Sequence, residues 1–382
     1  MVDDTLPDSK GATAATGVPT LTRRRLLRAL LAAGVVTAGA GGWILLGDGE
    51  GAPPVPPPPE GSGTAGLERF AQAITSGGPP KDGIPPIDEP RFVAGRDADF
   101  VDGDDVVFGL VHAGEVRAYP QLILVWHEIV NDRFSDGPLT VTYCPLTGST
   151  VGFRGTAPDR SEALTFGTSG DLVNSNLLMY DRQTDSRWPQ ILGRAITGPA
   201  VGAQLEEVPL VWTTWQRWRD AHPDTQVLST DTGAIRNYGA DPYGSYTPLS
   251  GYYAPDSRLY FDVLHHDDRF DAKQVAMGVK VGDSRLAVPK DAVRRRGVVA
   301  AQVGSHRVVL LHDPSLDEAR TFLTSDEEIV AAGDGRYAAA GTTWDPSGRV
   351  VDGPGSDLTR VLSYDVMWFA WAAFYPDTEV IA

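Results

Sequence analysis

The stretch that decides the fold is Trp215-Gln-Arg-Trp-Arg-Asp-Ala-His-Pro-Asp-Thr-Gln-Val227, because it recurs in register as Trp368-Phe-Ala-Trp-Ala-Ala-Phe-Tyr-Pro-Asp-Thr-Glu-Val380. Both copies follow the pattern W-x-x-W-x-x-x-x-P-D-T-x-V. Residues three apart lie on one face of a helix, and a proline ends it. We therefore expect a helix from Trp212 to Ala221, stopped by Pro223, and a second helix that carries the repeated W-x-x-W motif.

Two further echoes lie in the same order along the chain. Val106 to Pro120 resembles Val275 to Pro289, and Tyr180-Asp181 has a counterpart in Trp344-Asp345. Internal similarity of this kind is typical of duplicated units. We expect two related halves, residues 91–230 and 271–382, joined by a Gly/Tyr-rich connector at 231–270.

Strand patterns dominate both halves. Val106–His112 and Glu115–Tyr119 flank Ala113-Gly114 and predict a hairpin, and Leu177–Tyr180 with Ser186–Trp188 predict another. Leu139–Cys144 alternates, so that Cys144 shares a face with two threonines. The expected fold class is mainly β with short helices (α+β). A short helix is expected between Leu67 and Thr75, and folded structure from near Phe92.

The N-terminal region reads as an export and tethering segment. Arg23 and Arg24 precede the uncharged run Ala29–Gly47, which resembles a twin-arginine signal and is close to the roughly 20 residues that span a bilayer. Residues 1–50 are thus an export signal or a membrane anchor, and both alternatives place the rest outside the cytoplasm. Residues 51–90, rich in Pro and Gly, are expected to be a linker.

Composition excludes several classes of protein. The formal charge of −17 opposes nucleic-acid binding, which needs a basic surface. An acidic, lysine-poor chain fits salt adaptation, although a GC-rich genome also favours Arg over Lys. A single cysteine excludes an intramolecular disulfide and a zinc site built from several thiolates. The chain has no phosphate loop, dinucleotide fingerprint, serine-nucleophile elbow or calcium loop.

The candidate site centres on Cys144, in Tyr143-Cys-Pro-Leu-Thr-Gly-Ser149, and on His127, in His127-Glu-Ile-Val-Asn-Asp132. Cys144 is a buried structural thiol, a nucleophile activated by His127, or a ligand with His127 for a transition metal such as copper or iron. His127 is otherwise a satisfied histidine at the end of an element. Glu128 is placed to orient the imidazole ring. A short connection from Phe134 to Pro138 would bring His127 and Cys144 side by side.

The second half lacks this cluster. Cys144 aligns beside His312 or Asp313, and His127 beside Arg296 or Gly297. We therefore expect the first half to carry the active surface and the second to supply a wall.

Polar residues downstream are candidates for ligand binding. The sequence leaves two alternatives for these residues: they line a pocket, or they cap hairpins. His265-His266 is followed by two aspartates, but neighbours on a strand point to opposite faces, which favours a solvated loop over a metal site. The candidates are Ser169, Asn174, Asn176, Tyr180 and Asp181.

Several of these motifs together resemble the domain-of-unknown-function family numbered 3179. The resemblance rests on five segments: His127–Asp132, Tyr143–Ser149, Asn174–Gln183, His222–Thr225 and Asp267–Arg269. It covers nearly all of residues 90–382. It implies a prokaryotic, often exported protein and no particular activity.

Two functions follow as hypotheses. The first is an exported enzyme with a Cys144/His127 site that depends on a thiol or a metal and has redox activity. The second is a non-catalytic, extracytoplasmic module with a structural cysteine, which binds a small molecule or a cell-surface ligand. We expect no binding to nucleic acid. We expect contact with the membrane through the N-terminal segment if that segment is not cleaved.

Overall fold

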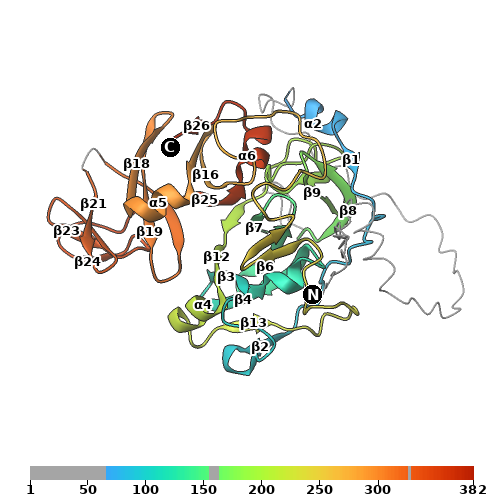
Figure 1. The fold of residues 1–382 in the computed structure, drawn as a ribbon, viewed down its shortest axis with the longest axis horizontal. Helices are drawn as coiled ribbons and strands as arrows, with labels where there is room; N and C mark the ends of the chain where they lie inside the picture. The colour runs from blue at the N-terminus through green and yellow to red at the C-terminus, as the bar shows by residue number, and fades with distance from the viewer. Residues whose placement is uncertain (1–65, 155–162, 326–327) are drawn as a thin grey trace, which may run out of the picture.

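The computed structural model describes residues 66–154, 163–325 and 328–382 (Figure 1). Within them the protein is mainly β with short helices, which confirms the expected fold class. The predicted export segment at 1–50 and the first part of the predicted linker lie outside the described residues. In the part of the chain that the structure describes, no helix combines the length and the apolar character needed to cross a bilayer.

Folded structure begins earlier than the sequence predicted, near Leu67 rather than near Phe92. Phe70 is buried in the main core, and Ile87 donates its N–H to the carbonyl of Ile129 at 2.9 Å. The expectation of a linker up to residue 90 is therefore wrong for this stretch, because its apolar side chains pack on the first half. Its elements are α2 (Glu68–Gln72) and β1 (Thr75–Ser76).

The first half contains the predicted hairpins, with one boundary corrected. The helix begins at Trp215 rather than Trp212, because the β-branched residues of β12 extend and pair with β3. The first-half framework is β2 (Phe92–Ala94), a 3-10 turn (Gly95–Asp97), β3 (Val106–His112), β4 (Glu115–Pro120), α3 (Gln121–Leu124), β5 (Ile129–Phe134), β6 (Gly137–Cys144), β7 (Ser149–Arg154), β12 (Val211–Thr214), α4 (Trp215–Ala221) and β13 (Gln226–Leu228).

Four strands are inserted between β7 and β12. β8, β9 and β10 form a sheet with β1, and β11 adds to the edge of β7. The predicted hairpin at 177–188 is the pair β9–β10. The inserted strands are β8 (Phe166–Val173), β9 (Asn176–Asp181), β10 (Arg187–Pro189) and β11 (Glu207–Pro209).

The second half is one seven-stranded sheet with a small four-stranded sheet attached, at the left of Figure 1. The connector before it contains only a small hairpin, β14 (Gly244–Tyr246) and β15 (Leu249–Gly251). The second-half elements are β16 (Val275–Val281), β17 (Ser284–Pro289), α5 (Lys290–Arg296), β18 (Val298–Val303), β19 (His306–Asp313), β20 (Glu318–Leu323), β21 (Val330–Gly333), β22 (Arg336–Ala339), β23 (Thr342–Trp344), β24 (Val350–Asp352), β25 (Arg360–Met367), α6 (Trp368–Phe374) and β26 (Glu379–Val380).

The same order of contacts occurs in both halves. In the first half, β3 pairs with β4 and with β12, and β4 pairs in parallel with β13. In the second half, β16 pairs with β17 and with β25, and β17 pairs in parallel with β26. Gly109 and Gly278 each lie under a tryptophan ring, of Trp218 and Trp371, where a Cβ would collide. These parallels agree with the predicted duplication, which stays a prediction until the two halves are superposed.

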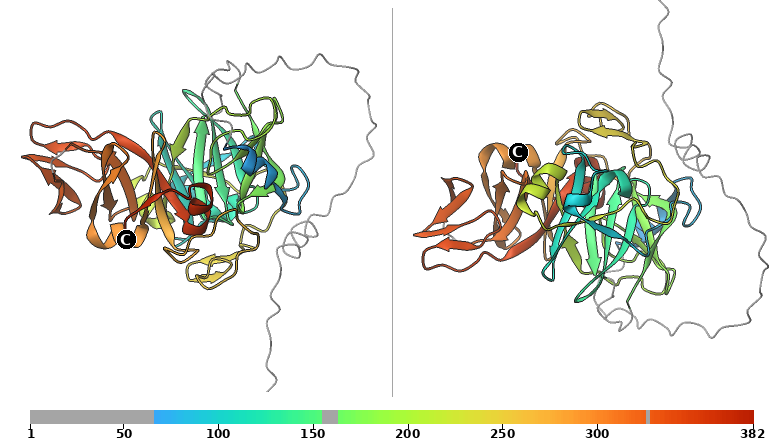
Figure 2. Two further views of the ribbon diagram at one scale, coloured as in Figure 1. Left: turned by 90° about the horizontal axis from the view of Figure 1, so that it is seen from above. Right: turned by 90° about the horizontal axis from the view of Figure 1, so that it is seen from below.

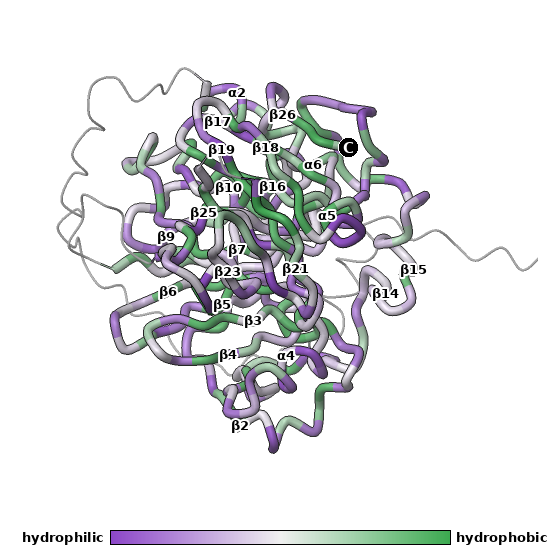
Figure 3. The backbone as a smooth tube through the Cα atoms, turned by 90° about the vertical axis from the view of Figure 1, so that its left-hand side faces the viewer, coloured by the Kyte–Doolittle hydropathy of each residue, from purple (hydrophilic) through white to green (hydrophobic). Residues whose placement is uncertain are grey.

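Each half also packs a turn onto the helix of the other. In the turn after β6, the carbonyl of Thr147 accepts the N–H of Met367, the residue just before α6, at 2.9 Å. In the turn after β19, the carbonyl of Pro314 accepts a hydrogen bond from the Arg217 guanidinium at 2.7 Å. Leu316 from the same turn packs in the core around α4. The main core is continuous across the halves, and the views of Figure 2 show them in contact. Hydrophobic segments run through the middle of the molecule in Figure 3.

Candidate functional site

Cys144 is the last residue of β6, and its sulfur lies in the core. The side chain is 1% exposed, accepts the Leu177 N–H at 3.3 Å and donates to the carbonyl of Ser175 at 3.9 Å. Burial raises the pKa of the thiol, and the Glu128 carboxylate raises it further. The geometry therefore favours a protonated thiol held between backbone groups.

His127 is buried and neutral, and both ring nitrogens are hydrogen-bonded. Nδ1 lies 2.7 Å from the carbonyl of Pro85, which only accepts, so Nδ1 carries the proton. Nε2 then accepts from the Tyr238 hydroxyl at 2.6 Å. Burial lowers the pKa of His127 to about 4. In this arrangement neither nitrogen is left over for a metal or for the thiol.

The strand pairing expected around these two residues is present. β5 and β6 are antiparallel, and the N–H of Tyr143 donates to the carbonyl of Glu128 at 2.8 Å. His127 and Cys144 thus lie at the same end of the hairpin, but their polar atoms have the different partners described above. Among the described residues, no group of three or more His, Cys, Asp or Glu side chains is placed to hold a metal ion.

Glu128 has a backbone conformation unusual for its type. Its φ is 60°. In the second half Gly297, with a φ of 72°, makes a similar contact, because its carbonyl accepts the N–H of His312. A side chain in this region costs about 1 kcal/mol or more. Glu128 is 5% exposed and close enough to Cys144 to raise the pKa of the thiol.

The downstream polar candidates brace the fold. Asn174 donates to the carbonyl of Ala373 at 3.1 Å and accepts the Leu264 N–H at 2.8 Å, so it ties the insertion to α6 and the connector. It also lines a cavity of about 400 Å³.

The other four each have a hydrogen-bond partner. Asn176 contacts Thr147 and Gln190, Ser169 contacts Leu178, Tyr180 contacts Asp82, and Asp181 accepts the Trp188 ring N–H. His265 is partly exposed, and His266 is exposed.

A cavity that the sequence did not reveal lies between the two halves and the connector. Its volume is about 570 Å³, within the usual range for small-molecule sites. Residues from β12, the β14–β15 hairpin, β16 and the segment just before it, α5 and β25 line it. They include Trp212, Tyr246, Lys273, Lys290, Asp365 and Met367.

The buried part of the lining carries an excess positive charge. Lys290 and Asp365 pair at 2.5 Å, and both are buried. Lys273, 6% exposed, donates to the Tyr252 carbonyl and the Ser257 hydroxyl, which are neutral. Burial lowers the pKa of Lys273 to about 8. A buried cation without an ion-pair partner is costly, and a bound anion would offset that cost.

Aromatic rings form one wall of the cavity and anchor the connector. Tyr246 stacks on Tyr253, and the Tyr143 hydroxyl lies 3.1 Å and 3.3 Å from the hydroxyls of these two. Asp241 accepts from Gln121 at 2.7 Å and from Tyr253 at 2.8 Å, and burial raises the pKa of its carboxyl. This buried network holds the β14–β15 hairpin against β6.

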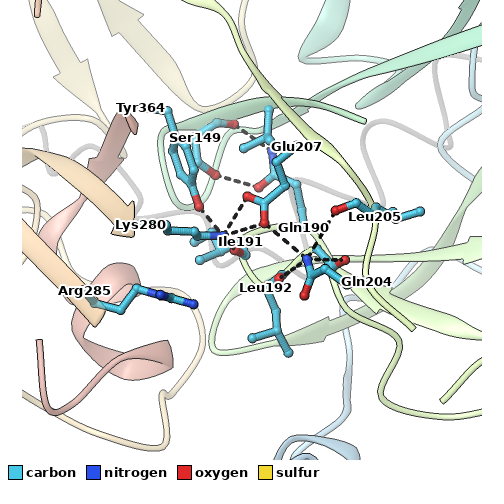
Figure 4. Close-up of polar contacts among 12 residues, drawn as sticks. Ser149, Gln190, Ile191, Leu192, Gln204, Leu205, Glu207, Lys280, Arg285 and Tyr364 are labelled. Atoms are coloured by element: carbon cyan, nitrogen blue, oxygen red, sulfur yellow. Dashed lines mark hydrogen bonds and ion pairs between the residues drawn. The ribbon is translucent and has the colours of Figure 1, made fainter. Parts of the chain in front are cut away.

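A buried ion pair joins the two halves (Figure 4). Lys280 of β16 lies 2.7 Å from the carboxylate of Glu207 in β11 and donates to the carbonyl of Ile191, also at 2.7 Å. Burial alone would lower the pKa of Lys280, but Glu207 raises it overall. The hydroxyls of Tyr364 and Tyr375 also reach the Ile191 carbonyl. These contacts fix the relative position of the halves.

Comparison with known proteins gives one match. A family model described as "Protein of unknown function (DUF3179)" matches residues 81–378. The searches of curated proteins and of solved structures found no match to the chain.

Proposed function

The chain belongs to this family of unknown function, and we propose that it is an exported, non-catalytic module that binds a small organic anion in the cavity between its halves. The observation that carries the proposal is the buried lining, which contains the paired Lys290 and Asp365 and the unpaired cation of Lys273. A buried charge is normally compensated, and a bound anion would compensate this one.

The rest of the lining suits an organic ligand. Trp212 and Tyr246 lie with ring centroids 5.2 Å apart and offer apolar surface, while Thr213, Thr214 and Thr247 offer polar atoms. Ligand sites generally combine apolar and aromatic walls with a few polar groups. Arg294 and Asp291 are exposed and form an ion pair at the rim.

Cys144 is structural in this proposal. A thiol- or metal-dependent redox site at Cys144 and His127 has less support, because burial raises the pKa of the thiol and His127 is held neutral by two hydrogen bonds. A nucleophilic thiol needs a lowered pKa.

Export is proposed from the sequence alone. Arg23 and Arg24 precede an uncharged run, as in a twin-arginine signal. Replacing both with lysine should stop translocation of the full-length precursor, as measured by cell fractionation. Unchanged translocation of that variant would rule out this route.

Thermal unfolding with a set of anions tests the binding proposal. The probes are pyruvate, lactate, succinate, benzoate and inorganic phosphate. A free anion at tenfold its Kd stabilises the folded state by about 1.4 kcal/mol. At least one probe should raise the Tm of the wild-type protein and not that of Lys273→Met.

Lys81→Met is the matched control, because Lys81 is half exposed and forms an ion pair with Asp185 away from the cavity. It should respond to the anion as the wild type does. Without ligand, Lys273→Met should be at least as stable as the wild type, since it removes an uncompensated charge. If no probe stabilises the protein, or if Lys273→Met responds equally, the proposal is wrong.

A further inference from the structure

The lysines of the described residues fall into two kinds. Three form an ion pair with a carboxylate, and Lys273 forms none with any described residue. The three pairs are Lys81–Asp185 at 2.7 Å, Lys280–Glu207 at 2.7 Å and Lys290–Asp365 at 2.5 Å. Lys273 is therefore the described lysine with the weakest stabilisation of its charged form.

The surroundings of Lys273 offer neutral acceptors and an aromatic ring in place of a paired carboxylate. Its Nζ contacts the Tyr252 carbonyl and the Ser257 hydroxyl and lies 3.5 Å from the centre of the Tyr252 ring. The Ser257 hydroxyl also donates to the Tyr252 carbonyl at 2.6 Å, so these two acceptors form a fixed pair. Burial lowers the pKa of Lys273 to about 8, against the opposing charge of the exposed Asp256. A substantial fraction of this amine is thus neutral just above neutral pH.

A neutral, buried lysine amine beside a cavity is a nucleophile for carbonyl compounds. We propose that Lys273 captures a small α-oxo acid in the cavity as an imine. This inference rests on the proposed function and names the class of its ligand. The carbonyl carbon of the acid meets the neutral amine, and its neighbouring carboxylate compensates the positive charge that the protonated imine carries.

The step balances without an oxidant or reductant. The Nζ lone pair forms a C–N bond to the carbonyl carbon, and one of the two nitrogen protons moves to the carbonyl oxygen to give a carbinolamine; the second leaves with that oxygen in the next step. Loss of that oxygen as water leaves a C=N bond in place of C=O. Protonation of the imine keeps a positive charge beside the carboxylate, so the bound state is an internal ion pair. Hydrolysis reverses the step and releases the acid unchanged.

Borohydride trapping tests the inference on the wild-type protein. The protein is incubated with pyruvate at pH about 8, reduced with sodium borohydride, digested and mapped by mass spectrometry. We expect a carboxyethyl group on Lys273 at least tenfold more abundant than on Lys81, the exposed lysine in the same digest. Lactate, which has the carboxylate but no carbonyl, should give no adduct.

The variant Lys273→Arg adds a second readout. It keeps the positive charge but cannot form the imine, so its Tm should still rise with lactate, while trapping with pyruvate falls to the level of Lys81. Equal labelling of Lys273 and Lys81 in the wild type would overturn the imine. The ligand-binding proposal is judged separately, by whether pyruvate and lactate raise the Tm, so the two failures are distinguishable.

Discussion

Removing the cation of the ion pair between the halves should be among the most destabilising single changes in the protein. Lys280 and Glu207 have side chains 7% and 6% exposed, and the ammonium lies 2.7 Å and 2.9 Å from the two carboxylate oxygens. Lys280→Met leaves the Glu207 carboxyl group buried without its partner, where burial raises its pKa. Breaking a buried pair in this way costs about 3 to 5 kcal/mol.

Two controls separate this effect from the loss of a lysine as such. The double variant Glu207→Leu/Lys280→Met removes both charges, and replacing a whole buried pair is often close to neutral. It should recover most of the loss, because the Ile191 carbonyl still accepts the hydroxyls of Tyr364 and Tyr375. Lys81→Met breaks an exposed pair and should cost about 0 to 1 kcal/mol.

Equilibrium unfolding in guanidinium chloride, followed by tryptophan fluorescence, gives the free energies of unfolding. The reasoning is refuted if Lys280→Met costs no more than Lys81→Met, or if the double variant is as unstable as Lys280→Met. In either case the pair would not be what holds the halves together.

Three further outcomes follow from buried groups. Burial lowers the pKa of His127 from 6.5 to about 4, so between these pH values the unfolded chain binds more protons than the folded protein. The free energy of unfolding should therefore fall by about 3 kcal/mol from pH 6.5 to pH 4. The variant His127→Gln should lack this pH dependence. Cys144 should react with a thiol reagent only after unfolding, and Cys144→Ala should cost about 1 to 3 kcal/mol in urea titrations, because the Leu177 N–H loses its acceptor. Gly278→Ala should cost about 1 to 3 kcal/mol, because its Cβ meets the Trp371 ring; an unchanged Tm would contradict the packing of that helix.

Local patterns predicted much of the framework. The alternation of Leu139–Cys144 and the flanks of Ala113-Gly114 gave strands where the structure has them, because side-chain period and turn residues act over short distances. The sequence pattern puts the start of the helix three residues too early, because Val211–Thr214 pairs as a strand with β3, a partner about 100 residues away.

The candidate site was harder to predict for the same reason. His127 and Cys144 lie at one end of a hairpin as expected, but the partners of their polar atoms come from Pro85, Tyr238 and Leu177, which no local pattern links to them. The cavity depends even more on distant parts, because its lining comes from both halves and the connector. The scarcity of lysine in the sequence is a property of the whole chain and does not locate the cavity.

A crystal structure of the full-length protein, grown with the most stabilising of the five anions, tests the central claim most directly. The account predicts the anion in the cavity between the halves, with an oxygen within hydrogen-bonding distance of Lys273 Nζ or, for pyruvate, a bond to that nitrogen. It also predicts no change at Cys144 and His127. An anion bound at Cys144, or anywhere outside the cavity, would contradict the account.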